Sequence, residues 1–452
     1  MGLARTPSAQ LPLGLSKRSP ASAPVPTPVP AAAPVTTWGP PAPVGLVAAL
    51  DVGTTKVCCL IARTDGEGGL QVVGIGHHLA RGLRAGAVVD MDGAENSICA
   101  AVDAAEAMAG VTIHAAHVNI SAGRQRSQTI GVEVSVAGDQ VSEFDIGRAV
   151  DQAMVRADTE GRDVIHAVPT RYSIDGAIGI RDPRGMYGAK LGVNLHVVTS
   201  DSSPARNLAV CVERGHLEAI GPVASPYASA LAVLVDDEMD LGATVIDMGG
   251  GTTTISVFFE GALALVDSIP VGGRHVTNDI ARGLSTPTAQ AERMKTLFGS
   301  AVAGPSDDKE LIDVPPLGEA KQSGANHVPR AALTGIIRPR VEEIFEMARA
   351  RLEASGYQNL GGRRVVLTGG ASQLQGAAET AARVFENQVR LGRSTGVSGL
   401  ADATSGPAFS TATGLLKYAA NGLADRDVGG RLKNPPSTGF VDRIGQWLRE
   451  NF

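Results

Sequence analysis

The amino-acid sequence predicts an α/β protein in which two similar domains face each other across a shared cleft. An apolar run followed by aspartate, glycine and threonine occurs at 47–55 and again at 243–253, with Asp51 and Asp247 in matching places. Both copies continue into further strand-like runs, and a third glycine turn at 369–370 follows another apolar run. Solenoid repeats recur every ~20–50 residues, so this much longer period indicates a duplicated domain.

Composition excludes several classes of protein. The chain has 452 residues, 43% of them hydrophobic, and a net charge of −6, which argues against a general nucleic-acid binder. The four cysteines form no C-x-x-C pair, so neither a zinc ribbon nor a disulfide scaffold is expected, as in a cytoplasmic protein. No apolar run approaches the ~18 residues of a membrane span, and no signal peptide is visible. His114 and His117 lack further ligands for a zinc site.

A tail and a first domain core are predicted before residue 128. Residues 1–44 are expected to be disordered, because eleven of the 26 prolines fall there among Ala, Val, Ser and Thr. The core is predicted over 45–127. It should contain strands at 46–52, 57–61, 70–75 and 118–121, and a helix over 94–109 that buries Ile98, Val102, Ala105 and Met108.

An inserted subdomain is predicted over 128–203. Residues alternate near 130–136, helical periodicity covers 145–157, and short strands are expected beyond it around a glycine-rich centre. The first domain core then resumes over 204–242.

The second domain core is predicted over 243–282 and again over 361–421, with a small subdomain at 283–360 between the two parts. Strands are expected at 254–259, 263–269 and 364–367. Helices are expected at 287–297, 331–355 and 407–420, with a loop over 300–330. A flexible linker over 422–438 and an amphipathic helix over 439–452 complete the predicted organisation.

The two glycine turns carry the chemistry. Glycine lets the backbone approach an anion and point its N–H groups at it, and threonine hydroxyls follow in both copies. Asp51 and Asp247 are expected to hold Mg²⁺ through water, and Lys56 to meet a phosphate as a point charge. The alternative is an ordinary pair of hairpin turns, which the repetition of the motif disfavours. The third turn, Gly369-Gly370, is expected to admit a flat ligand such as adenine, although such turns are common in α/β proteins.

Taken in order, these three motifs resemble the phosphate-one, phosphate-two and adenosine elements of the superfamily of actin, Hsp70 and sugar kinases. More narrowly, the chain resembles the FtsA family of bacterial cell-division proteins over about residues 45–452. The resemblance implies an actin-like two-domain ATPase fold with duplicated ribonuclease-H-like cores, and ATP with Mg²⁺ in the cleft. The stretches that carry the narrower match are 165–176, 179–186, 195–199, 277–281, 291–295 and 365–374.

The resemblance also implies which residues contact the nucleotide. Glu292 and Lys295, one helical turn apart, would reach the ribose and adenine, whereas from the residues alone a solvated helix pair is the simpler interpretation. The glycine turns would contact the phosphates and the adenosine. The implied contact residues in these turns are Gly53, Thr54, Thr55, Lys56, Gly249, Gly250, Gly251, Thr252, Thr253, Gly369, Gly370, Ala371 and Ser372.

One departure from the superfamily bears on catalysis. Members that hydrolyse nucleotide briskly carry Glu or Gln before a Pro-x-Ala-Ala helix, where this chain has Ser225. A serine hydroxyl does not act as a base at neutral pH, so at most slow ATPase activity is expected. The alternative function is a sugar-kinase-like phosphotransferase, which would need a catalytic aspartate beside a sugar pocket and no terminal amphipathic helix. An Hsp70-type chaperone is disfavoured because no substrate-binding domain of the usual ~150 residues follows the core.

The terminal segment has the pattern of a membrane-surface helix. Helical spacing puts its large apolar residues on one face, and basic residues flank them. From the residues alone, a helix that packs on its own globular domain remains the alternative; the preceding linker favours a detached anchor on an anionic membrane surface. The residues concerned are Phe440, Ile444, Trp447, Leu448, Phe452, Arg443 and Arg449.

Partners follow from the resemblance alone. It implies binding of the C-terminal tail of the ring protein FtsZ by a helix with Arg338, Arg340 and Glu343, paired with the 283–300 helix. It also implies self-assembly into filaments, contacts with other division proteins, and a peripheral location on the cytoplasmic face of the plasma membrane at the division site. No nucleic-acid partner is expected.

Overall fold

The computed structural model describes Gly2 and residues 45–65, 69–159, 161–317, 326–358, 364–401 and 404–421. Apart from Gly2, the predicted tail lies outside the described residues, and so do the linker and the amphipathic helix at 439–452. Within the described part, no helix is long and apolar enough to cross a membrane.

The first repeat is built on a five-stranded sheet with the order β11-β6-β1-β2-β3. Strands β1, β2 and β3 form an antiparallel meander. Strand β6 pairs in parallel with β1, and β11 pairs in parallel with β6. A small antiparallel hairpin of two short strands, β4 and β5, follows β3. The bounds are β1 (Gly45–Val52), β2 (Lys56–Thr64), β3 (Leu70–Leu79), β4 (Leu83–Arg84), β5 (Ala87–Val88), β6 (Ala115–Ile120) and β11 (Glu218–Ala224).

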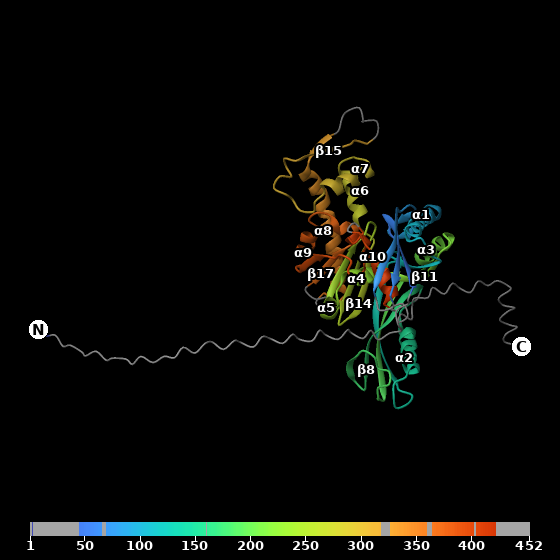
Figure 1. Ribbon diagram of the computed structural model, residues 1–452. Coiled ribbons are helices and arrows are strands. Elements are labelled where there is room, and N and C mark those ends of the chain that lie inside the picture. Colours follow the sequence, from blue (N-terminus) through green and yellow to red (C-terminus); the bar gives the residue numbers. More distant parts are fainter. Residues whose placement is uncertain are drawn as a thin grey trace. The chain divides into compact units, whose positions relative to one another are not determined.

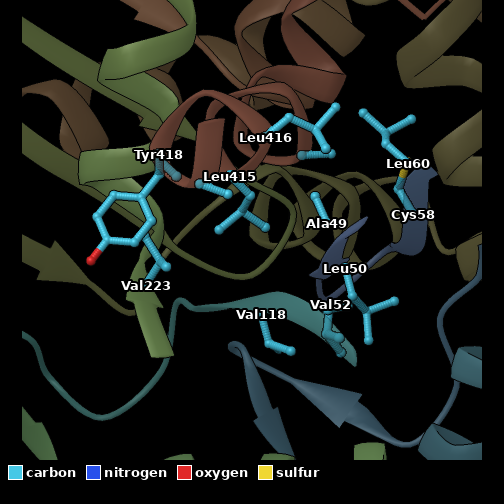
Figure 2. Packing of buried hydrophobic residues seen from close by; sticks show 14 of the residues in the cluster. Ala49, Leu50, Val52, Cys58, Leu60, Val118, Val223, Leu415, Leu416 and Tyr418 are labelled. Carbon is cyan, nitrogen blue, oxygen red and sulfur yellow. The ribbon is translucent and has the colours of Figure 1, made fainter. Parts of the chain in front are cut away.

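Helices cover both faces of this sheet (Figure 1). On one face lie α1 (Met91–Ala109) and α3 (Ser202–Arg214), and on the other lie α4 (Ser225–Val233) and α10 (Ser410–Ala420). Figure 2 shows Leu415, Leu416 and Tyr418 of α10 beside the apolar side chains of the strands. Burial on both faces explains why β1 reads as a continuous apolar run.

The predicted apolar face of α1 is wrong at one residue. Ile98, Val102 and Ala105 are buried as expected, but Met108 is 59% exposed. At ~100° per residue Met108 lies at the edge of this face, and it is Ala109 that packs against the core in the last turn.

The second repeat forms part of a sheet of nine described strands with the order β18-β17-β12-β13-β14-β7-β10-β8-β9. Strands β12, β13 and β14 repeat the antiparallel meander of the first sheet, and β17 pairs with β12 in parallel. The strands of this repeat are β12 (Ala243–Met248), β13 (Thr253–Phe259), β14 (Ala262–Ile269), β17 (Arg364–Thr368) and β18 (Gln388–Leu391).

The helices of the second repeat share one apolar cluster with its strands, and Phe345 is fully buried in it. The expected loop over 300–330 contains a short hairpin, so the expectation of a loop alone is wrong there. The expected helix at 407–420 begins as a 3₁₀ turn. The bounds are α5 (Asp236–Leu241), α6 (Gly273–Gly283), α7 (Thr288–Phe298), β15 (Leu311–Val314), β16 (Asn326–Pro329), α8 (Arg330–Ser355), η2 (Gly370–Gln373), α9 (Ala377–Phe385) and η3 (Pro407–Phe409).

The inserted segment supplies the remaining four strands of the nine-stranded sheet, covered by one helix. Of the strands expected to be short, those at 162–174 and 190–201 are long, because bulges and Pro169 interrupt the alternation that would have revealed their length, whereas the strand at 177–180 is short as expected. The helix packs its buried residues against the strands, mainly β7 and β10. The bounds are β7 (Arg126–Ser135), α2 (Glu143–Arg156), β8 (Arg162–Ile174), β9 (Ala177–Ile180) and β10 (Lys190–Asp201).

A connection between β7 and β14 joins the inserted segment to the second repeat. Asp267 pairs with Arg126, and the Ser127 hydroxyl both accepts from the Val266 N–H at 2.7 Å and donates to its carbonyl at 3.2 Å. The inserted segment interrupts the first repeat in sequence but extends the sheet of the second repeat in space.

Candidate functional site

A cavity of about 740 Å³ lies where the glycine turns of both repeats meet helices α6 and α7. Its wall brings together most of the residues singled out in the sequence. Those that line it are Asp51, Gly53, Thr54, Thr55, Lys56, Asp247, Gly249, Gly250, Thr252, Glu292, Lys295, Gly369, Gly370 and Ala371.

Three expected contact residues do not line the cavity. Thr253 begins β13 with its side chain inward, and its hydroxyl donates to the Val271 carbonyl at 2.8 Å. The Ser372 hydroxyl donates to the Gly369 carbonyl at 2.7 Å and is buried. Gly251 lies against Thr54. These three residues therefore contact other parts of the protein around the turns and do not face the cavity.

The first glycine turn joins β1 to β2. The Gly53 N–H donates to the Lys56 carbonyl at 3.0 Å, which closes the turn. The hairpin that follows β3 braces it: the Gly86 N–H donates to the Thr54 hydroxyl at 2.9 Å, and the Ala80 N–H donates to the Thr55 carbonyl at 3.0 Å.

The second glycine turn has the same closure, with the Gly249 N–H donating to the Thr252 carbonyl at 2.9 Å. The two turns touch. A Cβ on Gly250 would overlap the Thr55 hydroxyl, and one on Gly251 would lie 2.5 Å from the Thr54 hydroxyl. Glycine permits this approach, because a side chain at either position would require the threonine side chains or the turns themselves to shift.

Two buried carboxylates stand behind the turns. Asp51 accepts a hydrogen bond from Asn119 Nδ2 at 2.7 Å, and burial raises the pKa of Asp51 to about 7. Asp247 accepts from the Ser229 hydroxyl and from the Thr411 hydroxyl at 3.2 Å, and burial raises its pKa as well. In the described part of the chain, no third His, Cys, Asp or Glu joins them in a direct metal cluster. A cation here would therefore be held largely through water, as Mg²⁺ commonly is.

Lys56 supplies a positive charge beside these carboxylates. Its Nζ is buried 3.0 Å from the centroid of the Phe409 ring, and within the described residues it has no hydrogen-bond partner. Burial lowers the pKa of Lys56, since an ammonium group away from water is costly. A buried cation with open donor positions fits an anionic ligand in the cavity.

The third glycine turn follows β17. Gly369 adopts a left-handed backbone with φ of 84°, and its N–H donates to the Pro407 carbonyl at 3.1 Å. A Cβ on Gly370 would meet only Ala408, at 3.8 Å, so the wall is open at this point.

Glu292 and Lys295 form an ion pair on α7, with 2.8 Å between Oε2 and Nζ. Lys295 also donates to the Thr277 hydroxyl at 2.9 Å and to the Gly273 carbonyl at 3.2 Å, and its side chain is only 15% exposed. The pair is thus tied to the first turn of α6 and faces the cavity, unlike a solvated helix pair.

Sequence reasoning missed Asn119. It is the last residue but one of β6, which is almost wholly buried, and a polar residue at this place in a buried strand was the available signal. Its amide nitrogen donates to Asp51 and to the Ser225 hydroxyl at 3.1 Å, and its amide oxygen accepts from the Val52 N–H at 2.7 Å. Ser225 itself lines the cavity at the start of α4.

The residues proposed for partner binding lie on α8. Arg340 bonds to Asp279 of α6 and to Glu343, and Arg338 pairs with Glu342 at 2.9 Å. The ion pairs of this group reach α6, and α8 also contacts α7, the helix over 288–298 with which it is expected to pair. The predicted membrane residues at 440–452 are outside the described part of the chain.

Two repeated sheets around one cavity define the actin-like two-domain ATPase fold. Solved structures share this fold. The PilM–PilN type IV pilus biogenesis complex matches with a TM-score of 0.59 and 15% sequence identity, over 83% of this chain and 98% of that chain. MreB5 of Spiroplasma citri bound to ADP matches with a TM-score of 0.50 and 13% sequence identity, over 84% of this chain and 98% of that chain.

The chain belongs to the FtsA family of cell-division proteins. The family model "Cell division protein FtsA" matches residues 244–414, and the model of the SHS2 domain inserted in FtsA matches 122–199. FtsA of Agrobacterium fabrum is 46% identical over 90% of this chain and 95% of its own. FtsA of Pseudomonas aeruginosa is 38% identical and that of Escherichia coli 32% identical, each over 90% of this chain and 98% of its own.

Proposed function

We propose that this protein binds ATP with Mg²⁺ in the cavity and links the FtsZ ring to the cytoplasmic face of the plasma membrane during cell division. The observation that carries the nucleotide assignment is the meeting of two glycine turns, one from each repeat, each beside a buried carboxylate. Family membership supports the role in division.

The donor set fits the proposed cofactor. Backbone N–H groups of the turns at 53–56 and 249–252, with Lys56, would hold the phosphates, and Glu292 and Lys295 would lie on the adenosine side. Asp51 and Asp247 would hold a hydrated Mg²⁺, which supplies positive charge at the phosphates. Bound Mg²⁺ would also keep Asp51 ionised at neutral pH, because a nearby positive charge lowers a carboxyl pKa that burial has raised.

Slow hydrolysis is part of the proposal. Ser225 occupies the place of the water-orienting residue, and its hydroxyl accepts from Asn119. This arrangement positions polar groups near the carboxylates, but a serine hydroxyl does not act as a base at neutral pH. Nucleotide would then serve mainly to fix the relative position of the two repeats.

Titration calorimetry with the full chain tests nucleotide binding. Gly250→Asp places a carboxylate and a clashing side chain where the two turns touch, so ATP affinity should fall at least about tenfold. Gly147→Asp is the matched control, because Gly147 lies on α2 with open space around it and should leave binding unchanged. Unchanged ATP affinity in Gly250→Asp would contradict the assignment.

The FtsZ contact is proposed for the surface of α8 that carries Arg338, Arg340 and Glu343. Arg338 is half exposed and offers a positive charge for an acidic peptide, whereas Arg340 is held by Asp279. Fluorescence anisotropy with a labelled FtsZ tail peptide should show weaker binding by Arg338→Glu. Arg349→Glu, which removes a similar pair with Glu353 on the same helix, should bind like wild type. If Arg338→Glu bound the peptide as tightly as Arg349→Glu does, the surface around Arg338 would not be the FtsZ contact.

Membrane attachment is proposed for residues 439–452, whose apolar face carries Phe440, Ile444, Trp447, Leu448 and Phe452 beside Arg443 and Arg449. Self-assembly into filaments and contacts with other division proteins complete the proposal, on the basis of family membership.

A further inference from the structure

Three cationic side chains line the cavity, and two of them already have a place in the proposed site, Lys56 at the phosphates and Lys295 on the adenosine side. Lys56 is buried over the Phe409 ring, and Lys295 is held by Glu292, Thr277 and the Gly273 carbonyl. The third, Arg274, is exposed, and its guanidinium makes no hydrogen bond or ion pair with any residue that the structure describes.

The backbone of Arg274 is fixed to the second glycine turn. Its N–H donates to the Gly250 carbonyl at 2.7 Å, and the preceding Gly273 N–H donates to the Gly249 carbonyl at 3.0 Å. The first turn of α6 is therefore docked on the turn proposed to hold phosphate. The Arg274 side chain starts at this point and lines the cavity.

The charges in the cavity wall suggest what Arg274 binds. Asp51, Asp247 and Glu292 are the acids in the cavity wall, and they oppose the three cations before any ligand enters. A nucleoside triphosphate carries more negative charge than a diphosphate, and the extra charge lies on its terminal phosphate. Arginine matches such a group well, because its planar fork of N–H donors pairs with phosphate oxygens in two parallel hydrogen bonds.

We infer that Arg274 binds the terminal phosphate and makes the site prefer a nucleoside triphosphate to a diphosphate. This inference rests on the proposed nucleotide function and adds a residue that distinguishes the two nucleotide states. Arg274 would let the site distinguish a bound triphosphate from a diphosphate by affinity alone. Such a distinction does not require fast hydrolysis, which Ser225 is proposed to prevent. Arg274 acts here in specificity, by direct contact with the ligand.

The chain offers a matched control on the same helix. Arg282 lies in the last turn of α6, is exposed, and is not part of the cavity wall. Replacing either arginine by glutamine removes one positive charge from α6. Only the Arg274 change should matter for the terminal phosphate, and the fold should survive it because the backbone N–H, not the side chain, holds the glycine turn.

Titration calorimetry with the full chain measures the Kd values for MgATP and MgADP in wild type, Arg274→Gln, Arg274→Lys and Arg282→Gln. In Arg274→Gln we expect the Kd for MgATP to rise at least about tenfold and that for MgADP to change less than about twofold. Arg274→Lys should recover part of the preference, since it keeps the charge and loses the fork. Arg282→Gln should match wild type for both nucleotides.

Two results would overturn the assignment while leaving nucleotide binding intact. One is an equal loss of both affinities in Arg274→Gln, which would mean that the arginine shapes the cavity rather than reading the terminal phosphate. The other is an unchanged affinity for both nucleotides in Arg274→Gln, which would mean that the arginine does not contact the ligand. If the wild-type chain bound neither nucleotide, the proposed function itself would fail, together with the role of Arg274.

Discussion

Two neighbouring glycines in the third turn provide a test of the site's construction. Gly369 has a left-handed backbone, and a methyl group there would overlap Asp247 Oδ1 and lie 2.5 Å from the Met248 carbonyl. Gly370, the next residue, has an ordinary backbone, and a methyl group there would meet only Ala408 at 3.8 Å. Gly369→Ala and Gly370→Ala therefore make the same chemical change in opposite surroundings.

The structure sets the expected magnitude. Gly369 has φ of 84° and ψ of 160°, a conformation open almost only to glycine, and it costs an alanine about 1–3 kcal/mol. Forcing a methyl group into a packed site typically costs about 1–3 kcal/mol more. Gly369→Ala should therefore lower the free energy of unfolding by about 2–6 kcal/mol. Gly370→Ala should change it by less than about 1 kcal/mol, because the loss of glycine's freedom in the unfolded chain is the main effect there.

Circular dichroism during urea and thermal unfolding measures this difference, and titration calorimetry measures ATP binding in the same preparations. Gly369→Ala should lose both stability and ATP affinity, because the side chain that must move is Asp247. Gly370→Ala should keep wild-type stability and lose only ATP affinity, since its methyl group enters the cavity. Equal stability of the two variants would refute this reasoning about the third turn.

Three further predictions concern hydrolysis, pH and the membrane. Steady-state ATP turnover should be below about one per minute, and Ser225→Glu should raise it; turnover near the ~10 per second of typical enzymes would show that another group positions water. Burial and the nearby His166 lower the pKa of His196 to about 3, so protonation of His196 favours the unfolded chain. The contribution of His196 to stability should therefore fall by about 2 kcal/mol from pH 8 to pH 5, whereas Asp51, whose pKa is raised, acts in the opposite direction. His196→Gln should lessen this loss in urea unfolding, and an identical pH profile would contradict it. Trp447→Glu should stop the protein pelleting with anionic vesicles while ATP affinity stays the same; pelleting like wild type would favour a helix packed on its own domain.

The sequence by itself determined the duplication and the positions of the three glycine turns. These are local features: an apolar run, an aspartate and a glycine lie together in the chain, and strands buried on both faces have a recognisable composition. Most helices followed from apolar periodicity in the same way. Met108 departs from it because it lies at the edge of the apolar face, where helical spacing does not decide between a buried and an exposed side chain.

Tertiary structure alone decided which parts of the chain meet. The contact of Gly250 with Thr55, the bridge from Asn119 to Asp51 and Ser225, and the extension of the second sheet by β7 all join residues far apart in the sequence. The same holds for Lys295, which is committed to Glu292 and Thr277, and for Arg274, which is left free in the cavity wall. Such pairings arise from the packing of whole elements against one another, and local residue patterns carry no record of that packing.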